Sequence, residues 1–372
     1  MKTNFANLTS HEKKVWSLKF WSMARNASFL NMFAGTGANS MVQRITELTK
    51  TEKGDQAVIT LIADLTGDGV TGDYDLEGSE EEIKAYDTVI KIDQLRNANR
   101  AKGRMAEQKS IVNFRNTSHD QLAYWMGDRL DQMGFLSLAG VNYTQKNNGG
   151  TRPVLPTGRN LSDLAYAADV TAPTGDRHLR WVNASTELLA GNTASVVAAD
   201  TITYQALVLA KAHAKNNYIR GIKASNNEEV YHVFVNPSVM ASLKLDADYL
   251  ANVRSAGVRG GKNPLFAGTT SVMVDGLIIH EFRHVYNTQG APAGEKWGSG
   301  STVDGCRIAI CGAQALGIAD IGNANWVEKE FDFENQKAIA IDKICGFLKP
   351  RFHSNVSDSV QDFGVLSLDV AV

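Results

Sequence analysis

The chain has 372 residues, of which 43% are hydrophobic, enough for one large domain or two moderate ones with a sizeable core. Its 38 Lys and Arg against 40 Asp and Glu give a net charge of -2, which excludes a general positive field that would hold nucleic acid or an anionic membrane. Residues 1–6 lack the apolar core of a signal peptide, and no stretch reaches the ~18 apolar residues of a membrane span. We therefore expect a protein that is made and kept in the cytosol.

The N-terminal segment, residues 1–57, combines one helix signal with an irregular stretch. Thr9 and Glu12 form a capping box, and apolar residues at helical spacing follow, so we predict a helix over 9–25. Residues 27–55 contain several glycines and show no clean period. This segment is expected to be an arm that lies across another part of the structure, in the same subunit or in a neighbouring one.

Residues 58–104 are predicted to form a long hairpin. Strand patterns over 58–65 and 88–95 are joined by a glycine-rich acidic segment. Because an isolated hairpin is marginal in water, this one should pack on the body or on a neighbouring subunit. Residues 64–87 hold nine Asp or Glu and one Lys, whereas residues 91–109 hold six Lys or Arg and two acids. Two interpretations stay open: two solvated faces, or an acidic tip that meets a basic strip on the next subunit.

The clearest helix signal lies within residues 105–140. Ser118 and Gln121 form a capping box, and the apolar residues that follow recur at helical spacing. They are Leu122, Trp125, Met126, Leu130 and Met133. If residues 105–115 are also helical, the element exceeds 30 residues, which suits a spine along one side of the subunit.

The remainder of the chain is a polar, proline-containing stretch followed by mixed α/β patterns. We interpret residues 141–200 as an irregular insertion, and from residue 201 onward a mixed α/β pattern predicts a helix over 204–215 and a strand over 230–235. Asn236 and Pro237, an N-cap and first-turn proline, should start a helix that runs through Lys244. Strand patterns cover 271–286, 307–318 and 337–348, and residues 336–372 are predicted to return as strands. The fold class is therefore α+β.

Residues 280–284, His-Glu-Phe-Arg-His, match the pattern in which two histidines one helical turn apart bind zinc and the glutamate is a general base. That chemistry requires a helix. The preceding residues 272–279 are mostly β-branched or apolar and carry no cap, which is typical of a strand. In a strand, residues four apart lie about 13 Å apart, too far for one zinc ion. A zinc-dependent hydrolase that uses His280, Glu281 and His284 is the alternative function.

The sequence otherwise offers no constellation that carries chemistry. Cys306, Cys311 and Cys345 lie in apolar strand-like runs, and their odd number disfavours a disulfide framework. We interpret them as small buried hydrophobes, with a metal site as the alternative that lacks a complete ligand set. We therefore predict no catalytic, cofactor-binding or metal-binding residue.

Short sequences spread over nearly the whole chain carry a resemblance to a known family. They are Trp16-Ser17, Phe33-Ala34-Gly35, Lys53-Gly54-Asp55, Leu76-Glu77-Gly78-Ser79-Glu80-Glu81, Ile92-Asp93-Gln94-Leu95-Arg96, Phe234-Val235-Asn236-Pro237-Ser238 and Cys311-Gly312-Ala313-Gln314-Ala315. In these the chain resembles the major capsid proteins of tailed double-stranded-DNA bacteriophages with the Hong Kong 97-like fold.

The resemblance implies an N-terminal arm, an extended loop at 58–104, a spine helix of a peripheral domain at 105–140 and an axial domain at 201–335. It implies pentamers and hexamers of the chain in an icosahedral shell that encloses the DNA genome, with scaffolding, portal and head-completion proteins as partners and only weak contacts to the packaged DNA. The location implied is the virion, after assembly in the host cytoplasm and without a membrane. Some relatives crosslink subunits through a lysine and an asparagine, but no residue here matches that pair.

Overall fold

The computed structural model describes residues 23, 28–45, 54, 56–62, 67–83, 85–109, 113–154, 160–224, 228–256, 271–354 and 359–372. Apart from Met23, the predicted helix over 9–25 lies outside the described residues. Among the described helices, none combines the length and the apolar character that crossing a membrane requires.

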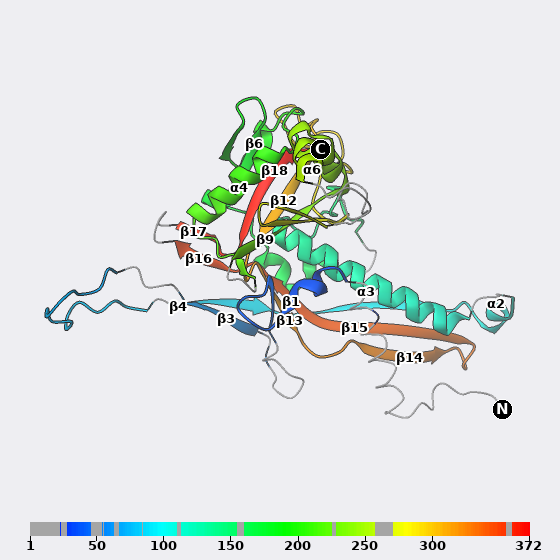
Figure 1. The fold of residues 1–372 in the computed structure, drawn as a ribbon. Coiled ribbons are helices and arrows are strands. Elements are labelled where there is room, and N and C mark those ends of the chain that lie inside the picture. Colours follow the sequence, from blue (N-terminus) through cyan, green and yellow to red (C-terminus); the bar gives the residue numbers. More distant parts are fainter. Residues whose placement is uncertain are drawn as a thin grey trace.

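Two large sheets form the body of the molecule (Figure 1). The eight-stranded sheet has the order β10 (Ser271–Val274), β11 (Leu277–Glu281), β9 (Glu229–Val235), β12 (Gly305–Cys311), β18 (Val365–Ala371), β6 (His178–Val182) and β7 (Glu187–Ala190), with β8 (Ile222–Lys223) also on β9. The six-stranded sheet has the order β1 (Ala34–Gly35), β2 (Val42–Ile45), β13 (Leu316–Asp320), β15 (Gln336–Leu348) and β14 (Asn325–Phe331), with β5 (Asp93–Arg100) also on β15.

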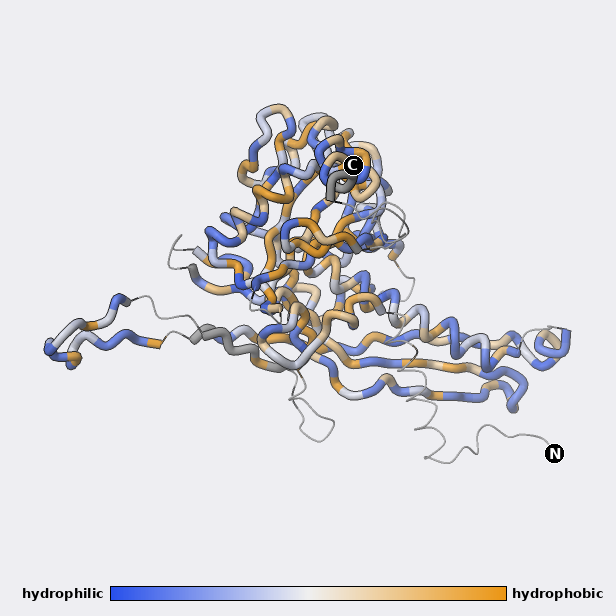
Figure 2. Tube along the Cα trace, viewed as in Figure 1, coloured by the Kyte–Doolittle hydropathy of each residue, from blue (hydrophilic) through white to orange (hydrophobic). Residues whose placement is uncertain are grey.

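Two hairpins lie outside the two large sheets, and helices pack against the sheets. The hairpins are β3 (Gln56–Ile62) with β4 (Ala85–Lys91), and β16 (Arg351–Ser354) with β17 (Ser359–Asp362). The α-helices are α2 (Arg104–Lys109), α3 (Phe114–Ala139), α4 (Tyr204–Asn216), α5 (Pro237–Leu245) and α6 (Ala247–Ala256). Short 3-10 turns are η2 (Leu30–Phe33), η3 (Leu161–Asp163), η4 (Ala165–Asp169), η5 (Gly175–Arg177) and η6 (Thr193–Ser195). Figure 2 shows apolar residues concentrated in the body, whereas the projecting loop is mostly hydrophilic.

The spine helix begins at a different residue from the one predicted. Asn113, not Ser118, is the N-cap of α3, and its side chain accepts from the backbone N–H groups of Arg115 and Asn116. Ser118 lies inside the helix and is buried. Because Asn113 has an extended backbone, α2 and α3 are separate helices, and the conditional prediction of one helix longer than 30 residues is wrong.

The end of α3 depends on Gly140, which has a left-handed φ of 67° and whose N–H bonds the carbonyls of Leu136 and Ser137. A Cβ atom here would lie 2.4 Å from the carbonyl oxygen of Thr171. Glycine is therefore required both by the backbone conformation and by the close approach of another segment.

Several local predictions are confirmed. The helix predicted over 204–215 is α4, the strand predicted over 230–235 is β9, and Asn236 caps α5 by accepting from the N–H of Ser238. The run 271–286 contains the antiparallel pair β10 and β11 rather than one strand, because Asp275 and Gly276 turn the chain with positive φ values. Cys306, Cys311 and Cys345 are free and buried, as interpreted from the sequence.

The two sheets cut across the predicted segment boundaries. Strands β6 and β7 lie within the segment 141–200 but belong to the eight-stranded sheet. Strands β13 and β14 lie within 201–335 but belong to the six-stranded sheet, and β18 returns from 336–372 to the centre of the eight-stranded sheet. Sheet membership is decided by pairing between distant segments, which local patterns do not reveal.

A buried ionic cluster joins α3 to the eight-stranded sheet. Arg307 on β12 donates to both carboxylate oxygens of Asp369 on β18, at 2.8 and 3.2 Å, and to the carbonyl of Ala139 at the end of α3 at 2.9 Å. His178 Nε2 on β6 lies 2.7 Å from Asp369 Oδ2. Arg307 therefore satisfies a buried carboxylate and a helix-terminal carbonyl at once.

Candidate assembly surfaces

The hairpin of β3 and β4 projects from the body and ends in an acidic loop (Figure 1). Residues 67–83 of this loop carry seven Asp or Glu and no Lys or Arg. The loop is partly ordered by its own carboxylates, since the N–H of Gly67 donates to Glu81 at 2.7 Å and the N–H of Gly78 donates to Glu80 at 2.8 Å. Tyr74 and Leu76 are exposed. An exposed, ordered loop with both charge and apolar residues is suited to contact another molecule.

The basic strip predicted over 91–109 is partly engaged within the chain itself. Lys91 Nζ lies 2.8 Å from Asp169 Oδ1, and the Arg100 guanidinium lies 4.3 Å from the centre of the Phe331 ring. Arg96 is exposed and lines a cleft. The strip as a whole is therefore no continuous free surface, and Arg96 is its basic member that lines the cleft.

The structure separates the three residues of the zinc-like string. His280 and Glu281 lie on β11, which confirms the strand interpretation, and His284 follows in a turn. His280 Nε2 lies 2.9 Å from Nδ1 of His232, Glu281 lies 3.6 Å from Lys244 Nζ, and His284 lies 2.6 Å from Asp128. Among the described residues, no three His, Cys, Asp or Glu side chains gather as metal ligands.

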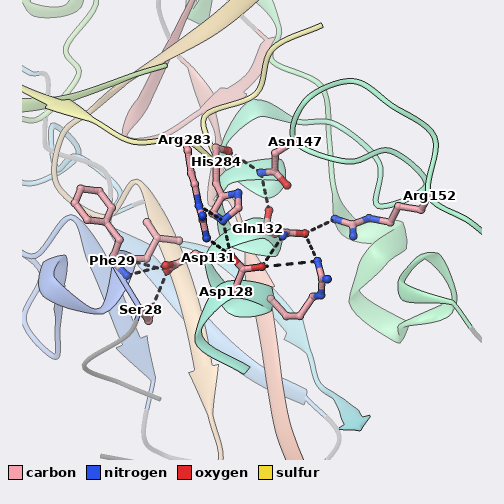
Figure 3. A network of polar contacts seen from close by, with 11 residues as sticks. Ser28, Phe29, Asp128, Asp131, Gln132, Asn147, Arg152, Arg283 and His284 are labelled. Carbon is pink, nitrogen blue, oxygen red and sulfur yellow. Dashed lines mark hydrogen bonds and ion pairs between the residues drawn. The ribbon is translucent and has the colours of Figure 1, made fainter. Parts of the chain in front are cut away.

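His284 belongs instead to a polar network on α3, which the sequence did not indicate (Figure 3). Asp128 Oδ1 accepts from Arg283 Nη2 at 2.9 Å and bonds His284 Nε2. The hydrogen bond with His284 is the largest reason that the pKa of Asp128 falls to about 2, with the charges of His284, Arg129 and Arg283 adding to it against the opposing effect of burial. Asp128 is therefore ionised and holds the loop after β11 against the spine helix.

A cleft of about 1410 Å³ opens beside this network, between α3, β5 and residues 146–153 and 160–164. Five Lys or Arg and three Asp line it. Two of the acids are occupied by backbone donors: Asp93 accepts from the N–H of Ala165, and Asp163 accepts from the N–H of Asn160. The third, Asp128, is in the network above. Because five Lys or Arg line the cleft against three Asp, its lining carries a net positive charge.

The basic side chains of the cleft include two that converge on a neutral acceptor. Arg129 Nη1 and Arg152 Nη2 both donate to Gln132 Oε1, at 2.5 and 3.1 Å. Burial, and then the charge of Arg129, lower the pKa of Arg152 to about 10. Arg129 also lies 3.9 Å from Asp128, whereas the contacts of Arg152 in the cleft are to the neutral side chain of Gln132 and the carbonyl of Gln145, so Arg152 can still bind an incoming anion.

Residues 28–30 of the N-terminal segment are held by the same helix, one turn further along, at Asp131. Asp131 accepts three hydrogen bonds: from Ser28 Oγ at 2.7 Å, from the N–H of Phe29 at 2.7 Å and from the N–H of Leu30 at 3.0 Å (Figure 3). The Phe29 ring stacks on Phe282, with centroids 4.3 Å apart. Residues 28–30 are thus bound to the spine helix within one chain.

Comparison with known proteins identifies the family. Residues 4–372 match the family described as phage capsid protein. The chain is 58% identical, over 372 residues, to the major capsid protein of Pseudomonas phage KPP25, covering 99% of this chain and 97% of that protein.

The chain belongs to the phage capsid protein family.

Solved structures agree in fold. The capsid of Ralstonia phage GP4 matches with a TM-score of 0.71 and 26% identity, over 91% of this chain and 89% of that one. The capsid of cyanophage Pam1 matches with a TM-score of 0.71 and 19% identity, over 100% and 96%. The fold of this capsid protein is the α+β, Hong Kong 97-like fold, as predicted. It is a structural component of the virion and not an enzyme, so the hydrolase alternative at His280–His284 has no support.

Proposed function

We propose that copies of this chain assemble into the icosahedral head of a tailed phage, which encloses the double-stranded DNA genome. Assembly takes place in the host cytoplasm, with scaffolding, portal and head-completion proteins as partners and without a membrane. The observation that carries this proposal is the 58% identity to a major capsid protein over the full chain. A net charge of -2 fits packaged DNA that is held by weak local contacts.

We assign the parts of the fold accordingly. The hairpin β3–β4 with its loop, which begins at Gln56 and covers most of the predicted segment 58–104, is the extended loop, and α3 is the spine helix. The six-stranded sheet together with α3 forms the peripheral domain, and the eight-stranded sheet forms the axial domain. This assignment follows sheet pairing, so β13 and β14 join the peripheral part and β18 joins the axial part.

The acidic loop 67–83 is proposed to dock in the basic cleft of a neighbouring copy. Its seven carboxylates match the excess of positive charge around Arg96, Lys146 and the pair that shares Gln132. Complementary charge fixes register and speeds encounter, and it is weakened by salt. This contact gives the projecting acidic loop a binding site on another subunit.

Assembly is tested with the purified full chain, alone and with its scaffolding protein, by light scattering and negative-stain electron microscopy. Closed shells of uniform size are expected. Persistent monomers under all salt and crowding conditions, scaffold included, would refute the proposal.

The docking contact is tested by charge reversal. Glu80 and Glu81 hold the loop's own amides, so the substitutions are better placed at Asp73, Asp75 and Glu77, each changed to Lys. This triple variant should fold normally and assemble poorly. Neutral Asn and Gln substitutions at the same positions are the matched control and should give a smaller defect.

The cleft side offers the reciprocal change. Arg96 and Lys146 are exposed, so Arg96→Glu with Lys146→Glu should also leave the fold intact and impair assembly. A variant that combines the reversed loop and the reversed cleft in one chain should recover part of the assembly. Unchanged assembly and salt dependence in both reversed variants would rule out the contact while leaving the shell function standing.

A further inference from the structure

The turn between β14 and β15 displays an aromatic ring at high conformational cost. Phe331 pairs with Gln336, so four residues make the turn, and three consecutive ones, Asp332, Phe333 and Glu334, have φ values of 50°, 48° and 67°. None is glycine. The left-handed region is unfavourable for such residues, and a bulky one there is rare. Strain of this kind persists where the surroundings or a function require it.

The turn is held in this shape by polar contacts. The N–H of Asn335 donates to the carbonyl of Asp332 at 2.9 Å, and its side-chain amide donates to the Asp332 carboxylate at 3.1 Å. Asn335 Oδ1 in turn accepts from the N–H of Arg104 at 3.3 Å. The Phe333 side chain takes no part in this, since it is 103% exposed. The turn is therefore held in place by polar contacts while the Phe333 ring is fully exposed on it.

The start of α3 lies at the same end of the molecule as β14 and the start of β15 (Figure 1). A groove of about 450 Å³ lies between these elements. Its apolar lining includes Phe114, Ala338 and Ile339. Three acidic and three basic residues complete the lining, so the groove carries no net charge. Because its charges balance and its lining includes Phe114, Ala338 and Ile339, the groove suits an aromatic ring better than the acidic loop 67–83.

We infer that Phe333 of one copy inserts into this groove of a second copy. The inference rests on the proposed shell function, because a capsid subunit repeatedly meets copies of itself. The ring and the groove lie at one end of the chain but are different surfaces, so each copy can both give a ring to a neighbour and receive one. Buried aromatic rings that fill a pocket are typical anchors of such interfaces. Phe333 is thus an assembly anchor at a distance from the acidic loop and its cleft.

The first test compares Phe333→Ala and Phe333→Leu with the wild-type chain. Because Phe333 is fully exposed, both variants should unfold at the wild-type temperature as unassembled subunits. Phe333→Ala should raise the protein concentration needed for assembly at least about tenfold, the effect expected for loss of one buried aromatic side chain. Phe333→Leu, which keeps an apolar anchor, should lie between the two.

The matched control is Tyr218→Ala. Tyr218 is also an exposed aromatic residue with a positive φ, of 56°, but it follows α4 near the eight-stranded sheet. It should assemble like the wild type. An equal defect in Tyr218→Ala would mean that any exposed ring matters, and would overturn the assignment to Phe333.

A second test asks where the ring goes. Chains with Phe333→Cys are mixed with chains with Ala338→Cys, assembled and oxidised; the three natural cysteines are buried and give little background. Disulfide-linked dimers should form in the mixture and not with either variant alone. Dimers of Phe333→Cys alone, or assembly of Phe333→Ala at the wild-type concentration, would refute the inference. Failure of the wild-type chain itself to assemble would instead refute the proposed function.

Discussion

Replacing Asp131 should release residues 28–30 from the spine helix. In Asp131→Ala, the backbone N–H groups of Phe29 and Leu30 lose their acceptor, and each unsatisfied buried donor costs about 1–3 kcal/mol. Burial raises the pKa of Asp131 against the opposing effect of its three donors, so removal of this carboxylate recovers part of that cost. We expect a net loss of about 2–4 kcal/mol, confined mainly to the N-terminal segment.

Hydrogen exchange measured by mass spectrometry or NMR is the suitable assay. A loss of about 2 kcal/mol corresponds to roughly 30-fold faster exchange at the two amides, since each 1.4 kcal/mol is a factor of ten. The control is Ser28→Ala, which removes one donor and leaves the carboxylate bound to both amides, so its effect should stay below about 1 kcal/mol. Wild-type exchange rates at Phe29 and Leu30 in Asp131→Ala would refute the reasoning.

Three further changes probe the body of the subunit. Burial and the neighbouring His232 lower the pKa of His280 to about 4, so between pH 6.5 and 4 the unfolded chain binds a proton that the folded chain does not. Acidification through this range should lower the free energy of unfolding by about 3 kcal/mol at most. In His280→Phe the free energy of unfolding should depend less on pH over the same range. Arg307→Met should cost about 3–5 kcal/mol in chemical denaturation because it leaves Asp369 buried without its main partner, and adding Asp369→Asn should recover part of the loss; equal stability of the single and double variants would contradict this. Gly140→Ala should lower the melting temperature through about 1–2 kcal/mol of left-handed strain plus the clash with Thr171, and an unchanged melting curve would argue against both.

Sequence patterns predicted elements well where the signal lies within a few residues of the element. The cap at Asn236, the limits of α4 and the strand character of the residues before His284 all come from local preferences that the fold does not override. The capping box at Ser118 is a false signal of the same kind. Asn113 offers an equally good cap five residues earlier, and the longer helix that it starts also includes Phe114.

What the sequence by itself determined is the fold class, the projecting hairpin, the buried cysteines and, through its resemblance, the family. The tertiary structure decided which strands share a sheet: the apolar run 307–318 divides between two sheets, because β12 pairs with β18 and β13 pairs with β15. The tertiary structure also decided the partners of the zinc-like string, since His284 bonds Asp128, which lies 156 residues away in the sequence. Such contacts follow from packing of distant segments, whereas periodicity and caps report only on neighbours along the chain.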